Sequence, residues 1–389
     1  MACYIGSNNN RVYAQIESGF GSAAAVMSND RLPITRVQLK ERRERGVRRD
    51  KTGGRTYMGV ADNLRRSAEV ALNVYHSGWD PAASEPVCGA LMQAALGAAP
   101  RVFAGGTVAA ASGLNLTTTA PHGLAPGQAV AFGGEIRFAE AIASATGLVL
   151  NAAFQTAPAA GAALRKTVSY FPGDVNPSVS IYDYWDPAGS VQRLLTGTGI
   201  NGLKIWLNGD FHEFEFSGAA RNLSDSSTFQ SGQAGMTQYP PEPQTAGWAP
   251  SLVPGNLGQV WLGNGPTEFF NVLDAQISLD NSLDLRVKEF GEGSSGCLAG
   301  GTREVRVDLS LYANTSAELE ELFAAGRQRT TVPMVFQLGN QAQHLCGIYL
   351  RSVGLEAPEF DDRDTKLVWK FSGARAEGTY NDEVVVAFA

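Results

Sequence analysis

Two stretches of this sequence, FHEFEFSGAAR at Phe211–Arg221 and KLVWKFSGARA at Lys366–Ala376, alternate apolar and polar residues and share the run Phe-Ser-Gly-Ala. Alternation with a period of two is typical of a β-strand that has one face in the core. Because the same strand occurs once in each half of the 389 residues, the sequence indicates an internal duplication.

The residues before these strands also correspond between the halves. In each half an alternating strand that ends in Tyr precedes a helix-like stretch. These are Ser67–Tyr75 with Glu85–Gly97, and Arg303–Tyr312 with Thr315–Gly326. Pro86 suits the first turn of the first helix, Thr315 or Ser316 suits the N-cap of the second, and both stretches stop at a Gly.

Further upstream, LPITRVQLK at Leu32–Lys40 is matched by VLDAQISLD at Val272–Asp280. The order strand, long loop, strand, helix, then three or four strands therefore occurs twice. The alternative is that two β-rich halves share alternation by chance. The common Phe-Ser-Gly-Ala and the matched order favour the duplication.

Two segments interrupt this pattern. Residues 102–165 are rich in Ala, Gly and Thr, nearly free of charge and broken by regular turn signals, which predicts a small inserted all-β domain. Residues 226–266 turn to Pro, Gly, Ser and Gln, a composition typical of an extended linker. We therefore expect a mainly β fold with short α-helices, its first unit at 1–101 and 166–225 and its second at 267–389.

The bulk composition indicates a globular protein, with 44% hydrophobic and 18% charged residues. The four cysteines show no CxxC pair, so we expect reduced, mostly buried thiols. The polar start MACYIGSNNN argues against a secretory signal, and no apolar run reaches membrane-spanning length. These features predict a soluble protein made in the cytoplasm.

Charge is concentrated in one run, LKERRERGVRRDK at Leu39–Lys51, which has a net charge of +4 in a chain of net charge −7. Proteins that bind nucleic acid non-specifically usually show a basic domain or face, whereas this chain is acidic, with a pI of about 5.3. A basic island in an acidic protein more often contacts an acidic protein surface, including another copy of itself. We therefore favour self-association over nucleic-acid binding.

Catalytic signatures are missing from the sequence. GEGSSG at Gly291–Gly296 fits the dinucleotide-binding pattern but precedes a strand instead of a helix, so we interpret it as a hairpin tip. The four histidines, which we expect at turns or on the surface, lie in separate elements without metal-ligand spacing. No nucleophile elbow, Walker loop or zincin motif occurs. We predict no catalytic, cofactor-binding or metal-binding residue.

Taken together, these features resemble the tail tube proteins of bacteriophages with long, flexible, non-contractile tails. The resemblance rests on YAQIESGFGSAAA near the start, the Leu32–Lys40 strand, the long charged loop, the strand-helix unit and the two Phe-Ser-Gly-Ala strands. It implies a duplicated β-sandwich or barrel with flanking helices, whose sheets pair edge to edge around a ring. It implies a virion protein, assembled in the host cytoplasm, whose stacked rings form the channel for genome ejection.

The duplication and the resemblance together lead us to expect a homotrimeric ring with pseudo-six-fold symmetry, and a homohexamer is the alternative. Double-stranded DNA would pass without tight binding through an acidic channel, because bound phosphates slow release. Alternation places four candidates on the channel face: Asp274, Gln276, Glu304 and Asp308. Tape-measure, tail terminator and distal tail proteins are the partners that the resemblance implies.

The resemblance also implies that the long charged loop reaches the adjacent ring. Its arginines are Arg42, Arg43, Arg45, Arg48 and Arg49. We expect them to dock on acidic residues of the next ring, with Asp361, Asp362 and Asp364 as the candidate partners.

Two other classes of function stay open at this stage. A carbohydrate-binding or hydrolytic β-protein would line a groove with Trp185, Trp206 and Trp248, although the first two lie in apolar strand patterns that favour core packing. A nucleic-acid-binding protein would use the arginine-rich loop, and its binding would weaken steeply with salt.

Overall fold

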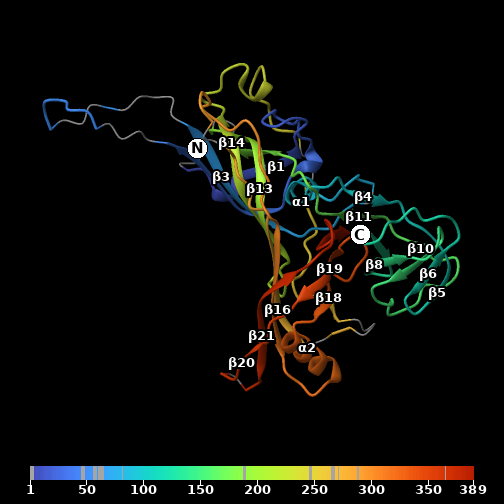
Figure 1. Ribbon diagram of the computed structural model, residues 1–389. Helices are drawn as coiled ribbons and strands as arrows, with labels where there is room; N and C mark the ends of the chain where they lie inside the picture. Colours follow the sequence, from blue (N-terminus) through green and yellow to red (C-terminus); the bar gives the residue numbers. More distant parts are fainter. Residues whose placement is uncertain are drawn as a thin grey trace.

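The structure is a computed structural model of the 389-residue chain. It describes all residues except 1–3, 45–48, 56–58, 60–64, 81, 187–189, 245–247, 264–267, 270, 287–288 and 364. The expected fold class is confirmed: the chain is mainly β, with two α-helices among the described residues. The two halves lie end to end, and a third body of strands lies beside them (Figure 1).

One antiparallel sheet runs through both halves. From the first half it takes β1 (Asn10–Ile16), β2 (Ile34–Arg43), β3 (Arg66–Tyr75), β12 (Val179–Trp185), β13 (Arg193–Trp206) and β14 (Glu213–Asp225). From the second it takes β15 (Gly258–Leu262), β16 (Val272–Asp280), β17 (Glu304–Tyr312), β18 (Thr331–Leu338), β19 (Cys346–Gly354), β20 (Glu359–Asp361) and β21 (Val368–Ala376). Three further strands complete it: β4 (Arg101–Phe103), β11 (Thr167–Tyr170) and β22 (Val385–Phe388).

The strand order is the same in the two halves. In the first half it is β2-β3-β14-β13-β12-β1, and in the second it is β16-β17-β21-β19-β18-β15. Even the irregularities correspond, because β2 shifts register between Ile34 and Arg36 and β16 shifts between Val272 and Asp274. The repeated sequence patterns predicted the order of elements along the chain, and the structure adds that the order of strands within the sheet is also repeated.

The shared Phe-Ser-Gly-Ala lies at a local irregularity in each copy. A Cβ at Gly218 would approach the carbonyl oxygen of Gly199 to 2.0 Å, so only glycine fits where β13 and β14 come close. The counterpart Gly373 has φ +67°, a left-handed conformation that also favours glycine. The backbone therefore favours glycine at both irregularities, by close approach at Gly218 and by a left-handed conformation at Gly373.

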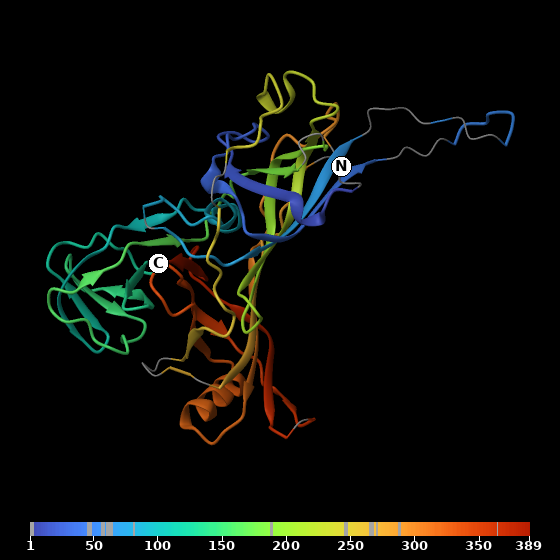
Figure 2. The same ribbon diagram turned by 180° about the vertical axis from the view of Figure 1, so that it is seen from behind.

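The helices occupy the expected places, with corrected ends. α1 (Gly89–Leu96) begins three residues after Pro86, not on it, and stops at Gly97, whose φ is +107°. α2 (Ala317–Gln328) is capped by Ser316, whose Oγ accepts a hydrogen bond from the Leu319 amide, but it continues past Gly326. Gly326 instead makes room for the carbonyl of Glu356, which a Cβ would approach to 2.7 Å. Both helices lie on the same side of the long sheet (Figures 1 and 2).

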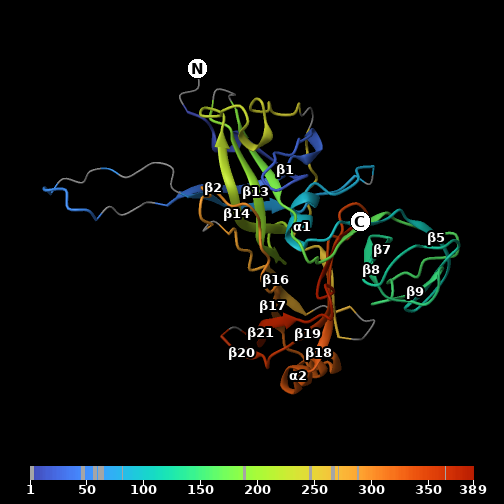
Figure 3. The ribbon, with the colours of Figure 1, turned by 45° about the horizontal axis from the view of Figure 1, so that its top comes forward.

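The inserted segment forms a separate six-stranded sheet beside the two halves (Figure 3). Its strands are β5 (Gly106–Ser112), β6 (Asn115–Thr118), β7 (Ala129–Phe132), β8 (Glu135–Ile142), β9 (Gly147–Leu150) and β10 (Ala163–Leu164). Apolar residues from all six strands pack into a core of their own, which includes Val108, Leu116 and Leu148.

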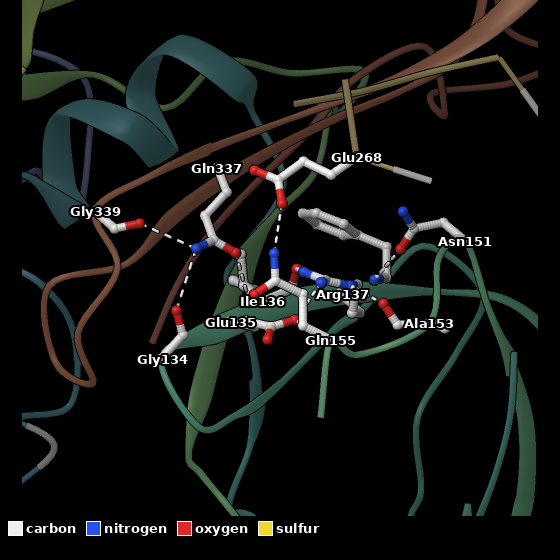
Figure 4. Close-up of polar contacts among 11 residues, drawn as sticks. Gly134, Glu135, Ile136, Arg137, Asn151, Ala153, Gln155, Glu268, Gln337 and Gly339 are labelled. Carbon is white, nitrogen blue, oxygen red and sulfur yellow. Dashed lines mark hydrogen bonds and ion pairs between the residues drawn. The ribbon is translucent and has the colours of Figure 1, made fainter. Parts of the chain in front are cut away.

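β8 joins the inserted sheet to the second half of the chain (Figure 4). The buried amide of Gln337 in β18 accepts a hydrogen bond from the Ile136 nitrogen at 2.9 Å and donates one to the Gly134 carbonyl at 3.2 Å. Phe138 stacks on Tyr349 with ring centroids 5.2 Å apart. The inserted sheet is therefore fixed against the second half, although it begins and ends in the first.

The Pro- and Gly-rich segment before the second half is largely irregular, yet it contacts the fold. Tyr239 packs on the tyrosine cluster of the first half, and Glu242 pairs with Arg11 and accepts a hydrogen bond from Tyr13 at 3.0 Å. Gly258–Leu262 of this segment form β15, which pairs with β18.

Two of the four histidines are buried, contrary to the expectation of turn or surface positions. His76 packs between Phe214 and Phe388, and its Nε2 lies 3.1 Å from the His344 carbonyl. His212 is also buried, with its Nε2 2.7 Å from the Leu257 carbonyl. Burial, followed by the charge of His212, lowers the pKa of His76 to about 3.

This burial predicts acid sensitivity. Below the usual histidine pKa of about 6.5, His76 binds a proton in the unfolded chain but not in the folded protein. Acid therefore favours unfolding, and His76 makes its full contribution to stability only above about pH 6.5. Between about pH 6.5 and 3, His76 alone should lower the free energy of unfolding by about 1.4 kcal/mol per pH unit. Denaturant unfolding at several pH values checks this slope, to which the lowered pKa of His212 also contributes. His76→Gln should flatten the slope, and an unchanged slope would show that His76 does not cause it.

Candidate assembly surfaces

Five described strands of the long sheet, namely β1, β2, β4, β15 and β20, pair with a single other strand, and two of these, β2 and β20, form unlike edges at the outer ends of the two halves. β2 pairs with β3 alone, and β20 pairs with β21 alone, among the strands that the structure describes. The two edges lie at opposite ends of the sheet (Figure 1). Unpaired edges expose backbone donors and acceptors that favour pairing with another chain.

Within the chain, the corresponding edges of the two halves, β13 and β16, are paired with each other. The last part of β13 pairs antiparallel with β16, so that Lys204 lies opposite Ser278, Ile205 opposite Ile277, and Trp206 opposite Gln276. Ile205 and Ile277 are 1% and 3% exposed. β16 of the second half thus covers the edge of the first half and buries an apolar pair.

The corresponding apolar residue at the far edge is uncovered. Phe360 lies opposite Trp369 in β21, as Ile205 lies opposite Phe214 in β14. Phe360 stacks on Trp369 at 5.2 Å and yet is 57% exposed. Sequence reasoning treated this region only as a source of carboxylates. Aligning the residues that precede the two Phe-Ser-Gly-Ala runs could have identified the edge.

The face of the sheet opposite the helices is charged. The alternation expected of β16 and β17 is confirmed, since Ala275, Ile277, Val305 and Val307 are buried. The four candidates Asp274, Gln276, Glu304 and Asp308 lie on the opposite, helix-free face.

Acidic and basic side chains interleave on this helix-free face, so it is not uniformly acidic. Its acidic residues are Glu69, Glu213, Glu215, Asp274, Asp280, Glu304, Asp308, Glu359 and Asp361. Its basic residues are Arg36, Lys40, Arg42, Lys204, Arg306, Lys370 and Arg375.

Many of these charges neutralise each other within the chain. Glu304 pairs with Arg306 at 2.7 Å and with Arg375 at 2.9 Å. The hydrogen bond from Arg306 lowers the pKa of Glu304. Lys204 lies 3.7 Å from Glu215, on the neighbouring strand. Several cations of this face therefore already have carboxylate partners within the chain.

The tryptophans do not form a common groove. Trp206, expected in the core, is 44% exposed on the helix-free face. Trp185 is half-buried, and its Nε1 donates to Asp183 at 3.2 Å. Trp248 lies under the Arg31 guanidinium, 3.9 Å from the ring centroid. The three rings lie in different elements, each with its own neighbours.

The five arginines of the basic run do not form one loop. Arg42 and Arg43 lie in β2 and pair within the chain, with Glu69 at 2.6 Å and Glu41 at 3.0 Å. Arg45 and Arg48 lie outside the described residues. Arg49 is exposed in a segment that projects far from the sheet (Figure 1).

The acidic candidates are also divided. Asp361 lies in β20 and pairs with Lys370 at 2.6 Å and with Arg363 at 3.2 Å, and the hydrogen bond from Lys370 lowers the Asp361 pKa. Asp362 is exposed and Asp364 lies outside the described residues. No contact between the basic run and these aspartates appears in the described part of the single chain.

Among the described residues, no group of three or more His, Cys, Asp or Glu side chains could hold a metal ion. Cys88 and Cys346 are buried free thiols, as expected, whereas Cys297 is exposed. None of the described helices is both long and apolar enough to span a membrane.

Comparison with known proteins agrees with this architecture. The family model of phage tail tube proteins matches residues 7–379, nearly the whole chain. A search of curated proteins finds no match. The match covers both halves and the inserted sheet, and the chain therefore belongs to the phage tail tube protein family.

Proposed function

We propose that three copies of this chain form a ring of six similar units, and that stacked rings make the channel through which the phage genome leaves the virion. The repeated strand order carries this proposal, because one chain supplies two units with unlike edges, β2 and β20, at their outer ends. Unlike edges make a head-to-tail contact, which generates a ring when the rotation closes. A closed ring would pair both of these edges, which otherwise invite uncontrolled association.

The helix-free face is our candidate for the channel wall. With the helices, the apolar core and the inserted sheet on the other side, this face supplies the long polar surface that a channel needs. Asp274, Gln276, Glu304 and Asp308 would then line it. DNA would slide because most lysines and arginines there are held by carboxylates, so few phosphates would find an unpaired cation.

We assign ring stacking to the part of the basic run that follows β2. Arg45, Arg48 and Arg49 follow the two arginines that pair inside the chain, and Asp362 and Asp364 of the next ring are the candidate partners. Contacts between exposed opposite charges weaken with salt.

Reversing these charges tests the assignment. Arg45→Glu, Arg48→Glu and Arg49→Glu together should leave rings intact and abolish their stacking into tubes, as seen by negative-stain electron microscopy. The matched control places the same charge change on exposed arginines outside the run, Arg286, Arg327 and Arg329. Tubes of normal length from the first variant would refute the assignment.

The tube also suggests a position for the inserted sheet and a set of partner proteins. The inserted sheet would lie on the exterior, where its bulk does not obstruct DNA. Assembly in the host cytoplasm, followed by contact with tape-measure, terminator and distal tail proteins, completes the proposed role.

A further inference from the structure

The junction inside the chain provides a template for the junction between chains. Aligning Phe216 with Phe371 in the shared motif makes Leu72 of β3 equivalent to Leu309 of β17, because each lies opposite that phenylalanine. The terminal tyrosines of β3 and β17, Tyr75 and Tyr312, then coincide as well. The alignment is therefore fixed by residue pairs along both strands.

The same alignment makes β2, which pairs with β3, equivalent to β16, which pairs with β17. Leu39 lies opposite Val70 in β2–β3, and Ile277 lies opposite the equivalent Val307 in β16–β17. Gln38 and Lys40 are then the equivalents of Gln276 and Ser278. β2 thus offers to a neighbour the same edge that β16 offers to β13.

β20 corresponds to the last part of β13, the strand that pairs with β16 inside the chain. Glu359, Phe360 and Asp361 lie opposite Lys370, Trp369 and Val368, as Lys204, Ile205 and Trp206 lie opposite Glu215, Phe214 and Glu213. Pro358, just before β20, cannot donate a backbone hydrogen bond, so the ladder that β20 offers is short.

We propose that β20 pairs antiparallel with β2 of a second copy of this chain in the register of the β13–β16 junction. Glu359 then lies opposite Lys40, Phe360 opposite Leu39, and Asp361 opposite Gln38. This inference rests on the proposed tube function and adds the residues that close the ring.

Two properties of the edges support this register. First, Phe360 is 57% exposed, whereas its equivalent Ile205 is 1% exposed. Ile205 is buried because β16 pairs beside it, and no described strand pairs with β20 on that side. Pairing with Leu39, itself partly buried against the core, covers Phe360 in the same way.

Second, the charges alternate across the proposed junction. Lys370 lies opposite Glu359 in β21–β20, and Lys40 lies opposite Glu69 in β2–β3. Joining the two edges in this register produces the row Lys370, Glu359, Lys40, Glu69. Opposite charges on facing strands are stabilising. A shift of two residues along β2 would keep opposite charges together but would place the apolar Phe360 opposite Glu41 instead of Leu39.

Disulfide trapping tests the register. Paired residues on facing strands have Cα atoms about 4.5–5.5 Å apart, within the range that a disulfide spans. The double variant Leu39→Cys, Phe360→Cys, with Cys3 and Cys297 changed to Ser, should give dimers and trimers and nothing larger on non-reducing gels. Cys88 and Cys346 can remain because both are buried.

The register control is Glu41→Cys with Phe360→Cys, which moves one cysteine two residues, or about 6.6 Å, along β2. It should cross-link at least tenfold less. If wild-type rings form but the 39–360 pair does not cross-link, the register is wrong and the tube function stands. If no rings form at all, the proposed function fails as well.

A second variant tests the edge without new disulfides. Phe360→Asp should leave a folded monomer, because the side chain is largely exposed, and should abolish rings in sedimentation and microscopy. Phe290→Asp is the matched control, since Phe290 is fully exposed in a different segment. Normal rings from Phe360→Asp would overturn the proposal.

Discussion

Replacing Ile277 with Ala is expected to lower the free energy of unfolding by about 2–5 kcal/mol. Ile277 is 3% exposed and lies opposite Ile205, so it belongs to the core that both halves share. Removing three carbons there costs the lost burial and leaves a cavity that the surrounding strands only partly fill. The same strands hold the two units of one chain together.

The measurement is denaturant unfolding followed by tryptophan fluorescence and by circular dichroism. We expect both signals to move to lower denaturant together, because β13 and β16 form one sheet. The control is Ser278→Ala, the adjacent residue on the helix-free face, which should change stability by less than about 0.5 kcal/mol. Two separate transitions, only one of them shifted, would contradict a shared core.

The second large effect is expected at Arg137, whose side chain is fully buried in β8 (Figure 4). Its guanidinium pairs with Glu135, donates to the Ala153 carbonyl at 3.0 Å and lies 4.0 Å from the Trp261 ring centroid. Burial lowers the pKa of Arg137 to about 10, so the group stays charged at neutral pH.

Arg137→Ala removes one partner of a buried ion pair and should destabilise the inserted sheet by about 3–5 kcal/mol. Hydrogen exchange and limited proteolysis across residues 102–165 measure this locally. The double variant Glu135→Gln, Arg137→Met should recover most of the loss, because it removes the unpaired carboxylate and keeps apolar volume beside Trp261. Equal protection in wild type and Arg137→Ala would show that the ion pair does not hold the inserted sheet.

The sequence was sufficient for the repeated unit because local patterns specify it. Alternation in β3 and β17, the Ser316 cap and the glycine of the shared motif are properties of short segments. The inserted sheet was found in the same way, from turn signals and the absence of charge. The family resemblance drawn from these patterns is confirmed by the family match.

The errors concern positions that depend on the assembled sheet. Trp206 lies in an apolar pattern but faces the helix-free side, because the phase of β13 follows from its pairing with β14 and β16. His76 is buried because His344, far away in the sequence, provides a carbonyl for its ring. The exposure of Phe360 also depends on which strand is absent beside β20.

Electron microscopy of the purified wild-type chain at high concentration tests the central claim most directly. Class averages viewed along the ring axis should show a central hole surrounded by three chains that form six similar lobes. Only compact monomers, even when nucleating tail components are added, would contradict the account.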